Sequence, residues 1–287
     1  MKAILLFAGI IFLSGVTAQV KHSKQYKINS DHTSFPDTGR MAGHRYHDVL
    51  YDAQNHYSNH SVLIVVPPTF KAGKNINFIF WFHGWNNNID TALVYYHLLT
   101  QFEESKVNAV LVLSETASNA PDSYGGKLEQ QGMFSELVND VLVKLKQEKQ
   151  ISNKSKPGKI LLAGHSGAYR VMANILHLGG MPVNEVILFD ALYANTNEYI
   201  NWIKQDDSHR FINLYTSVGG TDEETKRMIN ELTLQNVSIK SIEETENSVD
   251  ILRNSRILFI HSAHEHNDII FNPDNFKMFL EQSVLMK

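Results

Sequence analysis

Residues 159–168, with the sequence KILLAGHSGA, decide the fold. Lys159–Ala163 is a short apolar run of the kind found in strands that are buried on both faces. Ala168–Leu178 carries apolar residues at the three-and-four spacing of a helix. Gly164-His165-Ser166-Gly167-Ala168 must then be a tight turn that exposes Ser166 at the carboxyl edge of a sheet, beside the free N–H groups of a helix N-terminus. The local pattern is that of a nucleophilic serine.

The same alternation of short apolar runs and longer amphipathic stretches extends in both directions. It predicts an α/β fold with a mostly parallel eight-stranded sheet flanked by helices. The expected strands are His44-Tyr51, Ser61-Pro67, Ile76-Phe82, Ala109-Ser114, Lys159-Ala163, Glu185-Phe189, Arg210-Thr216 and Arg256-His261. The expected helices are Thr91-Glu104, Phe134-Lys146, Ala168-Leu178, Asn197-Lys204, Glu223-Leu234 and Asp274-Leu285.

The composition is that of an ordinary globular domain. The chain has 287 residues, of which 43% are hydrophobic, a formal net charge of -4 and no cysteine. A domain of this size can bury a large core without disulfides. No basic stripe or cluster of Lys and Arg interleaved with aromatic residues is present, which argues against nucleic acid as a partner.

The N-terminus has the features of a secretory signal peptide. A positive Lys2 precedes the apolar run Ala3–Val16, and Val16-Thr17-Ala18 is a small-residue cleavage site. The run is shorter than a membrane-spanning helix, so we expect no stable membrane anchor after cleavage. We predict a signal peptide over residues 1–18, an extended leader over 19–43 and one catalytic domain over 44–287, secreted or periplasmic.

Gly164-His165-Ser166-Gly167-Ala168 resembles the nucleophile elbow of the α/β-hydrolase superfamily, with Ala168 in place of the last glycine. The resemblance implies an esterase-like or lipase-like serine hydrolase with a Ser-His-Asp triad and Ser166 as the nucleophile. His83-Gly84-Trp85 follows an apolar strand and is similar to the oxyanion segment of this family. By that resemblance, the backbone N–H groups of Trp85 and Gly167 are the oxyanion donors.

A serine nucleophile needs a histidine base, and the loop after the last predicted strand offers His261, His264 and His266. His266 best matches the layout of the family, because it shortly precedes the apolar pair Ile269-Ile270; His264 is the alternative. A metal site over residues 264–268 is a rival interpretation. No two of the histidines have helical i, i+4 spacing and no cysteine assists, so we expect no metal and no cofactor.

Two aspartates compete for the role of the acid. Asp190 ends an apolar strand, where a carboxylate needs a partner, and this position resembles the acid of pancreatic-type lipases. Asp222 has the commoner position in the family, after the next strand. However, Thr221 to Glu224 also reads as a capping box at the start of a helix, which gives Asp222 a structural explanation. We therefore favour Asp190, with Asp222 as the alternative.

The connection between the sixth and seventh predicted strands is too short for a large lid domain, so we expect an open site. This favours a carboxylesterase that cleaves a small-molecule or lipid-like ester through an acyl-enzyme. The long segment Glu115 to Gly132 is the expected wall of the cleft. Two other functions stay open: a hydrolase of carbohydrate esters or amides, and a binding protein on a hydrolase scaffold without catalysis.

Overall fold

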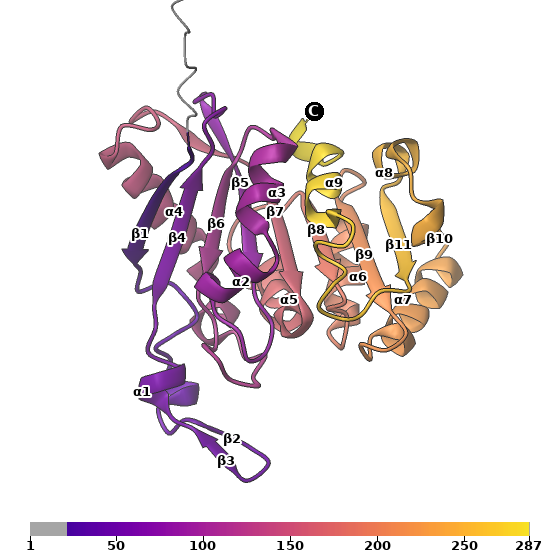
Figure 1. The fold of residues 1–287 in the computed structure, drawn as a ribbon, viewed down its shortest axis with the longest axis horizontal. Helices are drawn as coiled ribbons and strands as arrows, with labels where there is room; N and C mark the ends of the chain where they lie inside the picture. The colour runs from indigo at the N-terminus through magenta and orange to yellow at the C-terminus, as the bar shows by residue number, and fades with distance from the viewer. Residues whose placement is uncertain (1–21, 287) are drawn as a thin grey trace, which may run out of the picture.

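The computed structural model describes residues 22–286, and the predicted signal peptide lies outside them. Within this range the core is a nine-stranded sheet in the order β1-β4-β6-β5-β7-β8-β9-β11-β10 (Figure 1). The strands from β6 across to β10 run parallel, and β4 is antiparallel to both β1 and β6. The strands of the sheet are β1 (Lys24–Asn29), β4 (Ser61–Val66), β5 (Asn75–Phe82), β6 (Val110–Ser114), β7 (Lys156–His165), β8 (Glu185–Phe189), β9 (Arg210–Thr216), β10 (Lys240–Glu243) and β11 (Ile257–Ser262).

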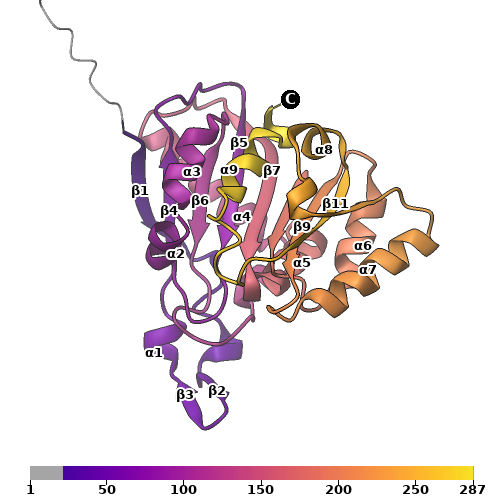
Figure 2. The same cartoon turned by 45° about the vertical axis from the view of Figure 1, so that its right-hand side comes forward.

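Helices cover both faces of the sheet, as Figures 1 and 2 show. One apolar core lies under α4 (Met133–Gln147), α5 (Tyr169–Leu178), α6 (Thr196–Gln205) and α7 (Asp222–Leu234). The other lies under α2 (Ile89–Tyr95), α3 (Leu98–Ser105), α8 (Val249–Asn254) and α9 (Asn275–Glu281). Successive side chains of a strand point to opposite faces, so strands rich in Val, Ile, Leu and Phe fill both cores. The prediction of a mostly parallel sheet flanked by helices is confirmed.

The prediction of eight strands is wrong at both ends of the sheet. The prediction missed β1 and β10, whose sequences KQYKIN and KSIE are mostly polar because both are half-exposed edge strands. The sheet therefore begins within the predicted leader, before residue 44. His44-Tyr51 is not in the main sheet: it folds into the separate hairpin of β2 (His44–Tyr46) and β3 (Val49–Tyr51).

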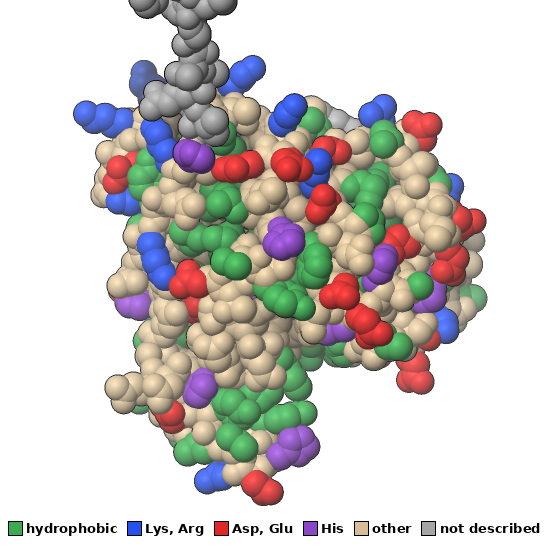
Figure 3. Space-filling model, in the orientation of Figure 1, with side chains coloured by type: hydrophobic (Ala, Val, Ile, Leu, Met, Phe, Trp, Pro, Cys, Tyr) green, Lys and Arg blue, Asp and Glu red, His purple; other side chains and the backbone are tan. Residues whose placement is uncertain are grey.

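The hairpin stands away from the sheet at the lower end of the molecule in Figure 1, next to the short helix α1 (Ala53–His56). Hydrophobic side chains gather on it in Figure 3. Val49 and Leu50 are 54% and 48% exposed. The expected helix Thr91-Glu104 is also interrupted, since His97 takes a left-handed conformation with φ of 51° and separates α2 from α3.

The connection from β8 to β9 contains α6 and no separate domain, as expected for a fold without a large lid. Within residues 22–286, no helix is long and apolar enough to cross a membrane.

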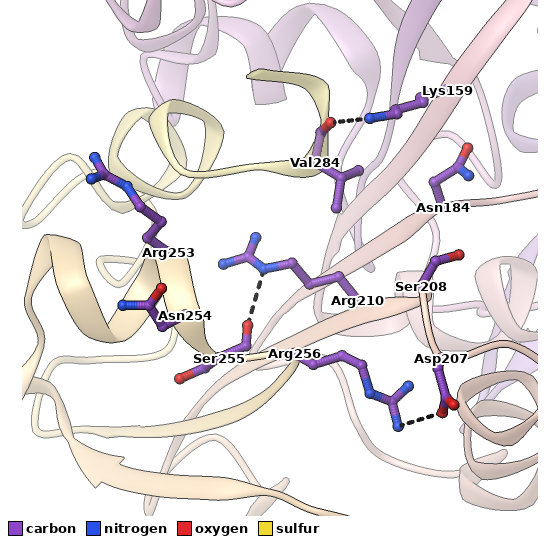
Figure 4. Close-up of a pocket in the computed structure, with 10 residues that line it drawn as sticks. All are labelled: Lys159, Asn184, Asp207, Ser208, Arg210, Arg253, Asn254, Ser255, Arg256 and Val284. Atoms are coloured by element: carbon purple, nitrogen blue, oxygen red, sulfur yellow. Dashed lines mark hydrogen bonds and ion pairs between the residues drawn. The ribbon is translucent and has the colours of Figure 1, made fainter. Parts of the chain in front are cut away.

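A cavity of about 390 Å³ lies at the amino ends of β9 and β11 (Figure 4). Two of its three arginines donate to backbone carbonyls: Arg210 to that of Ser255 at 3.2 Å, and Arg256 to that of Ile203 at 3.1 Å. Behind them, the buried carboxylate of Glu185 accepts from Arg210 and, at 2.8 Å, from the backbone N–H of Val284. The amino ends of these strands are therefore a structural junction, which hydrogen bonds join to the C-terminal segment.

Replacing one partner of the buried ion pair tests this junction. Glu185→Ala leaves the Arg210 guanidinium without its carboxylate in a site that is 4% exposed, so we expect the free energy of unfolding to fall by about 3–5 kcal/mol. Urea denaturation measures the change. The double variant Glu185→Met with Arg210→Met removes both charges, and its loss should be smaller than that of Glu185→Ala. An equal or larger loss contradicts the assignment.

Candidate active site

The turn after β7 holds Ser166 in an unusual backbone conformation. β7 ends at His165, and Ser166 opens the 3-10 turn Ser166–Ala168 that leads into α5. Its φ is 54°, in the left-handed region that residues other than glycine rarely adopt. Such strain persists only where the surrounding structure imposes it, and it concentrates at functional sites. The structure thus places Ser166 on the sharp strand-to-helix turn that the sequence predicts.

The loop after β5 packs directly on this turn. A Cβ on Gly84 would lie 2.6 Å from the Cβ of Ser166, and a Cβ on Gly167 would lie 2.4 Å from Cδ1 of Trp85. Both positions therefore require glycine, because any side chain would push the two segments apart. Trp85 and Gly167, the two predicted oxyanion residues, are neighbours across this contact.

The loops after β8 and β11 bring Asp190 and His266 together. His266 donates from Nδ1 to Oδ2 of Asp190 at 2.6 Å. A ring held through Nδ1 leaves Nε2 as the nitrogen that can exchange a proton with a substrate or a nucleophile. His266 and Ser166 line the same cavity.

Asp190 itself is fully buried and also has a left-handed φ, of 45°. Its carboxylate accepts from the N–H of Thr216 at 3.0 Å, from the hydroxyl of Thr216 at 2.7 Å and from the hydroxyl of Thr221. Burial alone would raise the pKa of Asp190, but the hydrogen bonds from His266, Thr221 and Thr216 outweigh it and hold this pKa below its usual value. The carboxylate therefore stays charged beside His266.

The structure does not bring the alternative acid, Asp222, to the histidine. Asp222 lies in the first turn of α7 and accepts from Nζ of Lys226 at 2.6 Å, one helical turn away. The predicted capping box is wrong. Thr221 makes no side-chain cap, because its hydroxyl donates to Asp190, and Glu224 accepts instead from Thr196 at 2.7 Å.

The other two candidate histidines, His261 in β11 and His264 in the loop after it, have separate partners. His261 lies 2.8 Å from Oε2 of Glu243 and 2.8 Å from the hydroxyl of Ser217, so both of its ring nitrogens are used. His264, the alternative base, lines a different cavity with Glu244 and Pro273. Among residues 22–286, no group of three or more His, Cys, Asp or Glu side chains is placed to hold a metal ion.

His165 forms a hydrogen bond with the backbone of the loop that carries His266. Its Nε2 lies 2.9 Å from the carbonyl oxygen of His266, which can only accept, so Nε2 carries the proton. Nδ1 then accepts from the hydroxyl of Tyr96 at 3.0 Å. Burial, together with the nearby charge of His266, lowers the pKa of His165 to about 3. This ring therefore stays neutral while it holds the backbone of the loop.

The cavity in front of Ser166 has a volume of about 480 Å³. Its lining is partly aromatic and partly amide: Trp85, Asn86, Asn87, Thr91, Tyr95, Tyr96, His165, Ser166, His266 and Asn267. The indole of Trp85 donates to the hydroxyl of Ser123 at 2.7 Å and lies 5.3 Å from the ring of Tyr46, centroid to centroid. The β2–β3 hairpin and the segment Glu115 to Gly132 thus buttress the mouth of the cavity.

Tyr193 is a further neighbour of Ser166 and Asp190. Its ring is 6.4 Å from that of His266 and 5.9 Å from that of Tyr169, and its hydroxyl donates to the carbonyl of Gly219 at 2.5 Å. Burial, with the nearby charge of Asp190, raises the pKa of Tyr193 to about 12. The phenol is therefore a neutral hydrogen-bonding group beside the site.

The sequence did not reveal the supporting residues Thr216, Thr221, His165 and Tyr96. Thr216 could have been found, because it ends a buried strand in the same way as Asp190. No local signal marks Tyr96, whose hydroxyl meets His165 only through the packing of α2 on the sheet.

Comparisons with solved structures place this arrangement in a known fold. The chain is similar to the fluorophosphonate-binding serine hydrolase F of Staphylococcus aureus, with a TM-score of 0.51, 12% identity, and coverage of 90% of this chain and 99% of that one. A ferulic acid esterase matches with a TM-score of 0.54, 10% identity, and 91% and 99% coverage. For the CE1 ferulic acid esterase of the anaerobic fungus Anaeromyces mucronatus the values are 0.52, 14%, and 94% and 95%.

The chain has the α/β-hydrolase fold. At these identities the likeness establishes the fold. No protein-family model matches the chain, and no curated protein matches it in sequence. In this fold Ser166 lies in the turn after β7. Trp85 lies in the loop after β5, Asp190 follows β8 and His266 lies in the loop after β11.

The low pKa of His165 predicts a pH-dependent stability. The folded ring titrates at about 3 and the unfolded ring at 6.5, so the unfolded chain binds the extra proton as the pH falls below 6.5. Stability is therefore lost with acidification, by up to about 1.4 kcal/mol per pH unit from this residue. His165→Gln keeps an amide donor near the carbonyl of His266 but does not titrate. Its free energy of unfolding in urea should fall less between pH 7 and pH 5 than that of the wild type; parallel curves would count against the assignment.

Proposed function

We propose that the protein is a serine hydrolase that cleaves carboxylic esters through an acyl-enzyme. The observation that carries the proposal is the 2.6 Å hydrogen bond between Asp190 and Nδ1 of His266, in a cavity that His266 shares with the strained Ser166. The signal-like sequence of residues 1–18 supports the further proposal that it acts after export. The names of the structural neighbours, a serine hydrolase and two ferulic acid esterases, favour an ester substrate.

In the proposed mechanism, Nε2 of His266 takes the proton of the Ser166 hydroxyl while Oγ attacks the ester carbonyl. The charged carboxylate of Asp190 keeps the ring in the tautomer that does this and stabilises the imidazolium that forms. The backbone N–H groups of Trp85 and Gly167 receive the oxyanion of the tetrahedral intermediate. His266 returns the proton to the leaving alcohol. Water then attacks the acyl-enzyme: His266 takes a proton from the water and gives it to Oγ of Ser166 as the acid leaves.

The arrangement around Asp190 favours catalysis over a binding role without chemistry. A fully buried carboxylate is costly unless it is compensated, and here its hydrogen bonds come from three residues, of which only His266 lines the cavity. A carboxylate at Nδ1 fixes the tautomer in which Nε2 can act as a base, so this arrangement favours catalysis over binding alone.

Removing the nucleophile tests the proposal. Ser166→Ala should reduce kcat for 4-nitrophenyl acetate by a factor on the order of 10⁵–10⁶, because attack by Oγ is lost. The folded state should persist, with an unchanged circular dichroism spectrum. Substantial turnover by purified Ser166→Ala would overturn the assignment.

A pair of matched substitutions tests the acid. Asp190→Asn leaves the size of the side chain unchanged but favours the wrong tautomer of His266, so we expect kcat to fall on the order of 10⁴-fold. Asp222→Asn removes a charge that pairs with Lys226 on α7 and should leave kcat about unchanged. The opposite order of losses in steady-state assays would make Asp222 the acid.

A further inference from the structure

A buried polar pair lies behind the loop that carries Trp85. His83 follows β5 and is the first residue of this loop. Its Nε2 lies 2.6 Å from Oε1 of Glu115, which follows β6. Both side chains are 1% exposed. Glu115 also accepts from the amide of Asn59 at 2.9 Å, and the hydroxyl of Thr116 lies 3.0 Å from Nε2 of His83. The proposed acyl-transfer steps use none of these groups.

The other ring nitrogen of His83 reaches the neighbouring backbone. Nδ1 lies 2.8 Å from the carbonyl oxygen of Gly84. A carbonyl oxygen can only accept, so Nδ1 carries a proton and donates it. Nε2 meets the carboxyl group of Glu115, which fixes the plane of the ring from the opposite side. The ring is thus clamped between Glu115 and the Gly84 carbonyl.

This clamp fixes the peptide that joins Gly84 to Trp85. The peptide is planar and its carbonyl and N–H groups point in opposite directions. With the carbonyl turned inward to His83, the N–H of Trp85 turns outward. Gly84 lies against Ser166, where a Cβ would be only 2.6 Å from that of the serine. Glycine gives the least resistance to rotation of its flanking peptides, so a peptide at this position needs an external hold.

We propose that His83, oriented by Glu115, is a positioning residue that holds the Gly84–Trp85 peptide with its N–H directed to the oxyanion of the substrate. The inference rests on the proposed function, because it specifies how one of the two oxyanion donors is preorganised. His83 touches neither the substrate nor Ser166 in this account; it acts through the backbone. A donor that is aimed before the reaction stabilises the charge that develops in the transition state more than it stabilises the bound ester.

Two polar substitutions separate the two sides of the ring. In His83→Asn, the side-chain amide occupies the place of Nδ1 and can still donate to the carbonyl of Gly84. In His83→Gln, the amide extends toward the place of Nε2, so it keeps the contact with Glu115 and loses the one with Gly84. Both variants keep a polar group in the buried site, which protects folding.

The test measures kcat and KM for 4-nitrophenyl acetate and the inhibition constant of benzeneboronic acid, which forms a tetrahedral adduct with an active serine. We expect His83→Gln to lower kcat by about 10²–10³-fold, the usual effect of one lost oxyanion donor, with KM nearly unchanged. The affinity for the boronic acid should fall in parallel. His83→Asn should keep kcat within about tenfold of the wild type.

Equal losses in the two variants, a larger loss in His83→Asn, or a loss that appears in KM would overturn the proposal and leave His83 a structural residue. Melting temperatures of both variants show whether the loss of kcat follows a loss of stability instead of the loss of the Gly84 contact. A loss of kcat that follows stability also overturns the proposal. Failure of the proposed function looks different, because the wild type itself would then neither turn over the ester nor bind the boronic acid.

Discussion

The left-handed backbone at Ser166 is the constraint on which the rest of the site depends. A φ of 54° at a serine is maintained because the surrounding structure imposes it. The turn joins β7 to α5, and the loop after β5 packs against it at Gly84. The same crowding explains the glycines at 84 and 167. Because β5, β7, β8 and β11 run parallel, their carboxyl ends lie at one end of the sheet, where Trp85 and His266 share a cavity with Ser166 and Asp190 hydrogen-bonds to His266.

Hydrogen bonds and burial fix the charge states of Asp190 and His165 around His266. Asp190 is buried, yet it stays ionised because His266, Thr216 and Thr221 all donate to it. His165 lies directly against the ring of His266, at 4.4 Å between centroids, and stays neutral. A neutral neighbour matters, since a second charged imidazole would oppose protonation of His266 during the reaction. The charge of Asp190 therefore stabilises the protonated form of His266 without an opposing charge on His165.

The sequence predicted the parts of the fold that local patterns encode, and it failed where tertiary contacts decide. The buried strands and the turn at Ser166 were predicted because apolar runs and small residues mark them. The edge strands β1 and β10 were missed because one half-exposed face leaves them without an apolar run. The role of Thr221 was also missed: a threonine before an acidic helix start reads as a cap, and only the packing of β8 beside β9 turns its hydroxyl to Asp190.

The central claim is that His266 and Asp190 activate Ser166, and the most direct measurement is labelling by a fluorophosphonate followed by peptide mass spectrometry. Such probes react with an activated serine and leave ordinary serine hydroxyls unmodified. The account predicts a single adduct on Ser166 in the wild-type protein, abolished by prior heat denaturation. A folded protein that takes no label, or that takes it on another serine, would contradict the account.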